Sequence, residues 1–284
     1  MKVNSFYPIL LFTLILSSCR KDPKIEIAYE YAFFVAGHTY GSPLVSPQHG
    51  LHYSFVNSIP FINNYKKMNF GVLTGDVVNQ PTQQFWDSAR AQINKLTIPI
   101  HIAAGNHDRG TVFESLYQPY YSYELQGDLF IILNTNGWKI INEQKDFLEE
   151  TIKTRAQFVN NIYIFTHELI WWTPTNIFKN IKVNYLPNYP GNTNYWEEIY
   201  PILDTLNNNI TFFAGDLGAT DQVTPYMYYK EKNITYIANG MGNGGKDNII
   251  IIEVDFDGNP HYKLYGINSS NPYIIENLES YILP

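Results

Sequence analysis

The sequence predicts an α/β protein in which two mixed β-sheets pack against each other and helices cover both outer faces. Short, unbroken apolar runs bounded by glycine recur along the chain, as in strands that are buried on both faces. In the first part of the chain, segments with helical spacing of apolar residues lie between these runs. Hairpin signals follow later in the chain. Strand–helix alternation followed by hairpins favours a four-layer α/β/β/α sandwich.

The alternation is clearest in the first third of the chain. Three apolar runs predict strands there, at residues 31–35, 70–74 and 98–104. Between the second and third runs, residues 82–95 follow Pro81 and carry apolar side chains at helical spacing, which predicts a helix. A further helix is expected at residues 58–67, with Pro60 in its first turn.

The rest of the chain predicts a hairpin, two helices and further strands. Residues 121–125 and 129–134 flank Gln126-Gly127-Asp128, which is a hairpin signal. The remaining helices are expected at 143–154 and 195–206, and the remaining strands at 162–165, 210–214, 234–238, 249–255 and 261–267. We therefore expect one domain over residues 28–267, followed by a C-terminal tail at 268–284.

The composition excludes several classes of protein. The 284 residues include a single cysteine and carry a formal charge of −7. One cysteine cannot form a disulfide framework or a cysteine-based zinc site. Binding to nucleic-acid phosphates requires clustered lysine and arginine, so the acidic balance argues against that partner. We expect no nucleic-acid partner.

Residues 1–18 have the pattern of a bacterial lipoprotein signal peptide. The apolar run at residues 6–16 is shorter than the ~20 residues that span a bilayer, but it fits a secretory signal. It ends in Leu16-Ser17-Ser18-Cys19, which resembles the lipobox in which the cysteine is lipidated. The alternative is an ordinary signal peptide. The lipobox predicts a chain anchored in the bacterial cell envelope through Cys19, periplasmic or surface-facing, with a polar tether at 19–27.

Polar residues follow the ends of several predicted strands. Because ligands of α/β sheets bind beyond the carboxyl ends of the strands, we expect these residues to lie close together. The clusters are Gly37-His38, Gly75-Asp76, Gly105-Asn106-His107-Asp108, Thr166-His167-Glu168 and Gly215-Asp216. The other four histidines lack this placement, and we expect structural or surface roles for them: His49, His52, His101 and His261.

This series resembles the motifs of the calcineurin-like metallophosphoesterase family over residues 28–267. The family carries D-x-H, G-D-x-x-[DN], G-N-H-[DE], a later histidine and G-H-x-H, in that order. Here the second motif is Gly75-Asp76-Val77-Val78-Asn79, residues 105–108 match the third, and His167 has the spacing of the fourth. The resemblance implies the family's fold and hydrolysis of a phosphate mono- or diester by a metal-dependent enzyme.

The first and last motifs depart from the family pattern. Ala36 replaces the metal-binding aspartate of the first motif, and Asp216 and Gly218 replace the two histidines of the last. By the family's correspondence, one metal keeps only His38 and Asp76, unless Glu168 or Asp221 helps. The other metal has a complete set of ligands: Asp76, Asn106, His167 and Asp216. We expect one firmly held divalent ion, manganese, iron or zinc.

The resemblance also implies catalytic roles for two histidines. A metal-activated water would attack the phosphate, and His107 would stabilise or protonate the leaving oxygen. His38 would orient the water or the substrate. The alternative is a non-catalytic protein of the same fold that acts as a binding or assembly factor at the cell envelope.

Trp171 and Trp172 are candidate substrate-binding residues. They precede a long segment at residues 173–194 that is rich in proline, asparagine and aromatic residues, and irregular segments of this length are often binding loops. Paired indoles beside the site could stack on a sugar or a base, so a phosphorylated small molecule or glycan is the expected partner. The alternative is that both side chains cover the rim of the core.

Overall fold

The computed structural model describes residues 28–42, 49–135, 137–184, 191–242 and 245–284. The expected signal peptide, the lipidation residue Cys19 and the tether at 19–27 lie outside the described residues, as does part of the segment at 173–194.

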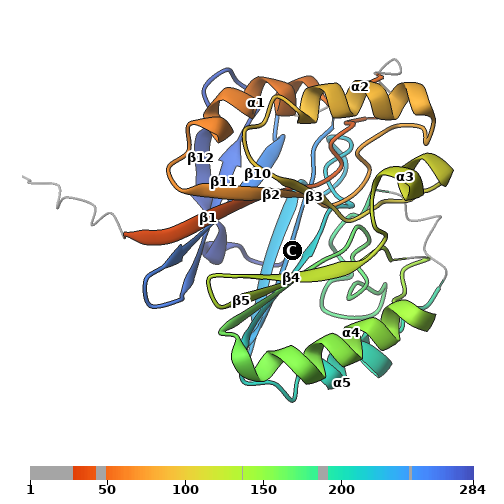
Figure 1. Cartoon of the computed structure of the whole chain (residues 1–284), viewed down its shortest axis with the longest axis vertical. Helices are drawn as coiled ribbons and strands as arrows, with labels where there is room; N and C mark the ends of the chain where they lie inside the picture. Colours follow the sequence, from red (N-terminus) through yellow and green to blue (C-terminus); the bar gives the residue numbers. More distant parts are fainter. Residues whose placement is uncertain (1–27, 43–48, 136, 185–190, 243–244) are drawn as a thin grey trace, which may run out of the picture.

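Two six-stranded mixed sheets form the centre of the molecule (Figure 1). Sheet A has the order β12-β11-β10-β1-β2-β3, and sheet B has the order β4-β5-β6-β7-β9-β8. The strands of sheet A are β1 (Tyr29–Ala36), β2 (Met68–Leu73), β3 (Ile100–Ile102), β10 (Asn248–Asp255), β11 (Pro260–Gly266) and β12 (Tyr273–Asn277). Those of sheet B are β4 (Tyr121–Leu125), β5 (Asp128–Ile132), β6 (Asn161–Phe165), β7 (Asn209–Ala214), β8 (Tyr226–Glu231) and β9 (Ile234–Asn239).

Helices cover the outer face of each sheet. Figure 1 shows α1 and α2 on one side of the two sheets and α4 and α5 on the other. Sheet A is covered by α1 (Tyr53–Asn63), α2 (Gln83–Ile93) and α3 (Thr111–Leu116), and sheet B by α4 (Asn142–Arg155), a π-helical turn (Tyr195–Ile199) and α5 (Tyr200–Leu203). The predicted four-layer α/β/β/α architecture is confirmed. No helix in the described ranges has the length and apolar character needed to cross a bilayer.

Burial of both faces explains why residues 31–36 of β1 are all apolar. Phe33 faces the other sheet, where its ring lies 5.5 Å from that of Phe130 and 5.1 Å from that of Tyr163. Its neighbour Phe34 points the opposite way and packs against Phe55 of α1. Because successive side chains of a strand alternate between faces, both sets must be apolar. The aromatic layer between the sheets holds the two halves of the molecule together.

Two of the observed helices differ from those expected from the sequence. The helix expected at residues 58–67 begins earlier and ends at Asn63, so Pro60 lies inside α1 and not in its first turn. The helix expected at 195–206 is a π-helical turn followed by a single α-helical turn. Pro201 lacks the N–H that would bond to the carbonyl of residue 197, which disrupts a regular α-helix there.

One α-helix and two strands in the described part of the chain were not expected from the sequence. They are α3, β8 and β12. β12 pairs with β11, so the residues expected to form a C-terminal tail extend sheet A. β8 and β12 are edge strands whose exposed side chains lack the continuous apolar pattern of a central strand.

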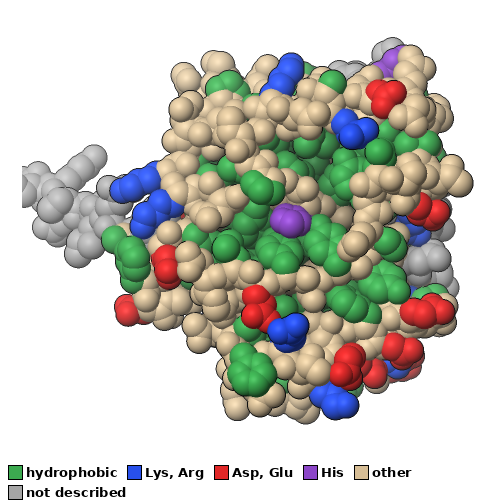
Figure 2. Space-filling model, in the orientation of Figure 1, with side chains coloured by type: hydrophobic (Ala, Val, Ile, Leu, Met, Phe, Trp, Pro, Cys, Tyr) green, Lys and Arg blue, Asp and Glu red, His purple; other side chains and the backbone are tan. Residues whose placement is uncertain are grey.

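Surface side chains are unevenly distributed on the face shown in Figure 2. Hydrophobic side chains gather around a histidine near the middle of this face, and charged side chains lie mostly toward the periphery.

Stability is expected to decrease between about pH 6.5 and pH 4 because of His101. Its ring stacks on Tyr123 of the other sheet at 4.4 Å, its Nδ1 lies 2.7 Å from the Tyr121 hydroxyl, and burial lowers its pKa to about 4. In this range the unfolded chain takes up a proton that the folded protein does not, so acid favours unfolding. Denaturant titrations should show a flatter decrease for His101→Gln, while the exposed control His49→Gln follows the parent protein. Identical pH profiles for His101→Gln and the parent would contradict this.

Candidate metal centre

A cavity of about 580 Å³ lies where the loops after β1, β2, β3, β6 and β7 meet. Five of the six residues predicted to hold a metal or to act in catalysis line it, namely His38, Asp76, Asn106, His107 and Asp216. The sixth, His167, lies fully buried against Asp76 and Asp216. The structure therefore brings all six residues to one place.

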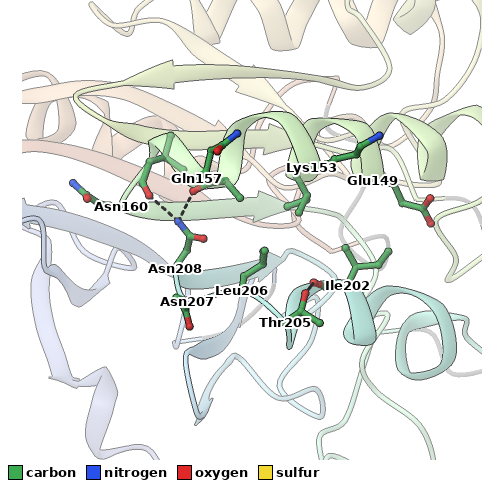
Figure 3. A pocket seen from close by; sticks show the side chains of 12 residues that line it. Glu149, Lys153, Gln157, Asn160, Ile202, Thr205, Leu206, Asn207 and Asn208 are labelled. Atoms are coloured by element: carbon green, nitrogen blue, oxygen red, sulfur yellow. Dashed lines mark hydrogen bonds between the residues drawn. The ribbon is translucent and has the colours of Figure 1, made fainter.

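A larger cavity of about 810 Å³ lies elsewhere, between α4 and the residues after α5 (Figure 3). None of the predicted site residues lines it. In the wall of this larger cavity, the side-chain amide of Asn208 donates to the main-chain carbonyls of Ala156 and Val159. We place the functional site at the smaller cavity because the titratable residues converge there.

Glycines allow the strand ends to approach closely. A Cβ on Gly75 would lie 2.5 Å from Nδ1 of His167, and one on Gly105 would lie 2.2 Å from Oδ1 of Asp76. The backbones of His38 and Asp76 are both left-handed, each with φ of 52°. This conformation is costly for a residue with a side chain, and such strain is often found at functional sites.

His167 presents an acceptor nitrogen to two carboxylates. Its Nδ1 lies 2.9 Å from the carbonyl oxygen of Thr74. A carbonyl only accepts, so Nδ1 carries the hydrogen and Nε2 of the neutral ring carries the lone pair. Nε2 lies 3.4 Å from Oδ1 of Asp76 and 3.8 Å from Oδ1 of Asp216, and it has no hydrogen-bond partner among the described residues.

The distance from Nε2 of His167 to Asp76 fits two neighbouring ligands of a divalent ion, and the distance to Asp216 is slightly longer than such a pair requires. Metal–ligand bonds of about 2.1 Å place neighbouring ligand atoms roughly 3.0–3.5 Å apart. A lone pair facing two carboxylates is repulsive unless a proton or a metal cation lies between them. The donor set of two carboxylates, an imidazole and an amide suits manganese, iron or zinc.

The protonation equilibria reflect the same concentration of charge. Burial lowers the pKa of His167, but the carboxylates of Asp76 and Asp216 outweigh it and raise the pKa well above its usual value. Burial opposes ionisation of Asp76, but His167 and His38 hold the pKa of this carboxyl below its usual range. Asp76 is therefore the negative group around which the histidines are arranged.

The four predicted metal ligands differ in burial. His167, Asp76 and Asp216 are buried together, whereas Asn106 is exposed at the cavity wall. As placed, no set of three or more histidine, cysteine or acidic side chains in the described part of the chain forms a closed metal cluster. Side-chain movements are needed to bring the ligands onto one ion.

Two of the three replaced motif positions, 36 and 218, contribute no ligand. Ala36 is fully buried and packs among the apolar residues under α1 and α2. Gly218 has φ of +76°, and a Cβ there would lie 2.4 Å from the carbonyl oxygen of Gly240. A histidine therefore does not fit at 218 without a shift of the main chain.

His107 and His38 lie on one wall of the cavity. Nδ1 of His107 donates to the carbonyl of Asn79 at 2.8 Å, which leaves Nε2 as the second functional atom. The ring of Tyr40 lies 5.1 Å from that of His107 and 4.6 Å from that of His38. Nε2 of His38 lies 3.4 Å from Oδ2 of Asp76, and burial lowers the pKa of His38.

Asp108 fixes the loops that carry these side chains. Its carboxylate accepts from the main-chain N–H groups of Val77, Val78 and Gly105 at 2.8, 3.0 and 2.8 Å. Burial, reinforced by the charge of Asp76, raises its pKa to about 6. The fourth residue of the G-N-H-D motif therefore joins the loop after β2 to the loop after β3.

The prediction that Trp171 and Trp172 bind substrate is wrong. They are 0% and 2% exposed, and neither lines the cavity. Trp171 packs edge-on against Phe212 on the outer face of sheet B, and Nε1 of Trp172 donates to the carbonyl of Ile181. Both indoles belong to the apolar layer on the outer face of sheet B, which agrees with the alternative that they cover the core and not a ligand.

The sequence analysis missed several residues that line the cavity, among them Arg109, Trp138 and Asn184. Arg109 directly follows the G-N-H-D motif, and that position was the available signal. Trp138 has φ of 65°, which is a rare conformation for a bulky residue, and it has no sequence signal comparable to the motifs.

No protein-family model and no curated protein matches this chain. The chain is similar to several solved structures at low sequence identity. A predicted phosphoesterase from Streptococcus pneumoniae is 10% identical with a TM-score of 0.37, covering 86% of this chain and 97% of that one. Vps29 from Chaetomium thermophilum is 9% identical with a TM-score of 0.35, covering 86% and 99%. Sulfate thiohydrolase SoxB from Thermus thermophilus is 9% identical with a TM-score of 0.45, covering 88% and 58%.

Asp216 is expected to be required for stabilisation by metal. Manganese or zinc at about 100 times its Kd should stabilise the parent protein by about 2.7 kcal/mol, and a chelator should reverse this. Asp216→Asn keeps the shape of the side chain but removes a charged ligand, so thermal denaturation should show little stabilisation by metal. Asp204→Asn, at a surface pair with Lys232, is the control. Equal stabilisation of both variants would exclude Asp216 as a ligand.

Proposed function

We propose that this protein is a metal-dependent phosphoesterase that hydrolyses a phosphate mono- or diester with one firmly bound divalent ion. The observation that carries the proposal is the buried Nε2 of His167, which faces the carboxylates of Asp76 and Asp216, so that a proton or a metal cation must lie between them. Asn106 completes the set of ligands from the cavity wall. The ordered series of motifs in the sequence supports the assignment to phosphate esters.

The chain's own residues hold the reacting groups and move the proton. When bound, a divalent ion polarises a phosphoryl oxygen and lowers the pKa of a water molecule. His107 is anchored through Nδ1 to the carbonyl of Asn79, so Nε2 is the atom that stabilises or protonates the leaving oxygen. His38, held 3.4 Å from Asp76, orients the water or the phosphate group.

A non-catalytic binding protein of the same fold is the second candidate. The loss of ligands at Ala36 and Gly218 favours it, since a second ion would lack most of its protein ligands. Electrostatic stabilisation of the transition state by a second ion is worth several kcal/mol, so a site with one ion is expected to be slow. Binding of metal without hydrolysis of any phosphate ester would favour this candidate.

Asp76→Asn is expected to abolish both metal binding and hydrolysis. Asparagine tolerates the left-handed backbone at this position, so the variant should fold. Elemental analysis of the parent should give about one equivalent of manganese, iron or zinc, and p-nitrophenyl phosphate and its diester report hydrolysis. Asp87→Asn on the exposed face of α2 is the control.

His107→Gln separates catalysis from metal binding. It should keep the metal and lower kcat by about 10²- to 10⁴-fold, because general acid catalysis is lost. If Asp76→Asn retained full hydrolysis, or if the parent bound no metal, the proposal would be wrong.

We also propose that the protein acts outside the cytoplasm on a phosphorylated small molecule or glycan. The support for a lipid anchor is the sequence Leu16-Ser17-Ser18-Cys19. The cavity of about 580 Å³ lies within the range of roughly 300–1,000 Å³ that is typical of small-molecule sites.

Cys19→Ser is expected to prevent lipidation. Without acyl chains the protein loses its membrane attachment, so fractionation of bacterial cells should move it out of the membrane fraction, and labelled fatty acid should no longer be incorporated. Ser18→Ala, which keeps a small residue before the cysteine, is the matched control. Incorporation of fatty acid into Cys19→Ser would exclude the lipobox.

A further inference from the structure

The described residues that line the cavity include more carboxylates than lysines or arginines. The carboxylates are Asp76, Asp216 and Glu168, and Arg109 is the one lysine or arginine among these described residues. One divalent ion and Arg109 together would balance three carboxylates. A phosphate group that entered without Arg109 would meet a site with net negative charge, which disfavours binding of an anion.

Arg109 is held rigidly by two neighbouring loops. Its Nη2 donates to Oε1 of Glu168 at 2.9 Å and to the carbonyl of Thr135. The second carboxylate oxygen of Glu168 accepts from the hydroxyl of Thr135. These contacts connect the loops after β3, β5 and β6. Because the guanidinium group is planar, fixing one of its nitrogens restricts the orientation of the whole group.

Arg109 and Glu168, which form an ion pair, differ in how far their side chains are exposed. The side chain of Glu168 is only 5% exposed, whereas that of Arg109 is 25% exposed. Both residues line the cavity, so the carboxylate lies deeper and the guanidinium presents more surface to an incoming ligand. An arginine placed in this way can donate a charge-assisted hydrogen bond to a phosphoryl oxygen from the terminal nitrogen that Glu168 and Thr135 do not occupy.

We propose that Arg109 binds the phosphoryl oxygens of the substrate and supplies positive charge that a second metal ion would otherwise provide. Glu168 and Thr135 are positioning residues that hold the guanidinium in place. This inference rests on the proposed function and assigns the anion-binding group of that site. The competing explanation is that Arg109 only connects the three loops, in which case its loss lowers stability without changing anion binding.

Calorimetric titration of the metal-loaded full chain with inorganic phosphate tests this inference. Arg109→Gln should raise the Kd for phosphate at least about tenfold, because a charge-assisted hydrogen bond is lost. Arg109→Lys keeps the charge but not the planar group that Glu168 and Thr135 position, so its Kd should lie between those of the parent and the glutamine variant. Arg155→Gln is the control, since Arg155 forms an exposed pair with Glu124 away from the cavity.

The outcomes separate this inference from the proposed function. The expected result includes a higher KM for Arg109→Gln and a preserved metal content. Parent-like phosphate affinity in Arg109→Gln, with a lower Tm, would overturn the role of Arg109 and leave the phosphoesterase proposal standing. If Arg109→Gln does not fold, parent-like affinity in Arg109→Lys has the same meaning. If the metal-loaded parent binds no phosphate, both proposals fail.

Discussion

The hydrogen bond between Nδ1 of His167 and the carbonyl of Thr74 is the contact on which the site depends. Thr74 follows β2 of sheet A and His167 follows β6 of sheet B, so this bond connects the two sheets at their carboxyl ends. It orients the imidazole so that Nε2 faces Asp76 of one sheet and Asp216 of the other, where a proton or a metal cation must lie between them. The proposed metal would join the same two sheets.

Close approach of the strand ends makes this contact possible. A Cβ on Gly215 would lie 1.9 Å from the carbonyl oxygen of Thr74, and one on Gly37 would lie 2.2 Å from that of Asn239. Side chains at these positions would push the sheets apart at the site. Farther from the site, the aromatic layer around Phe33 sets the spacing of the sheets. The distance between the two sheets therefore determines both the packing of the core and the geometry of the site.

The sequence predicted the central strands and the motif residues because both have strong local signals. β1 is apolar at every buried position, and Asp76, Asn106 and His107 follow such strands directly. Trp171 could not be assigned in this way, since an indole that stacks on a ligand and one that packs on Phe212 have the same sequence signature. Arg109 could not be assigned to the site from the sequence, because its contacts with residues 135 and 168 form only when separate loops come together in the fold. Edge strands and single helical turns carry too little apolar periodicity to be identified.

Anomalous diffraction from crystals of the metal-loaded protein tests the central claim most directly. Data collected at the absorption edges of manganese, iron and zinc would locate the ion and identify it. The account predicts one strong peak within bonding distance of Nε2 of His167 and of the carboxylates of Asp76 and Asp216. A cavity without such a peak, or an ion bound only at other residues, would contradict it.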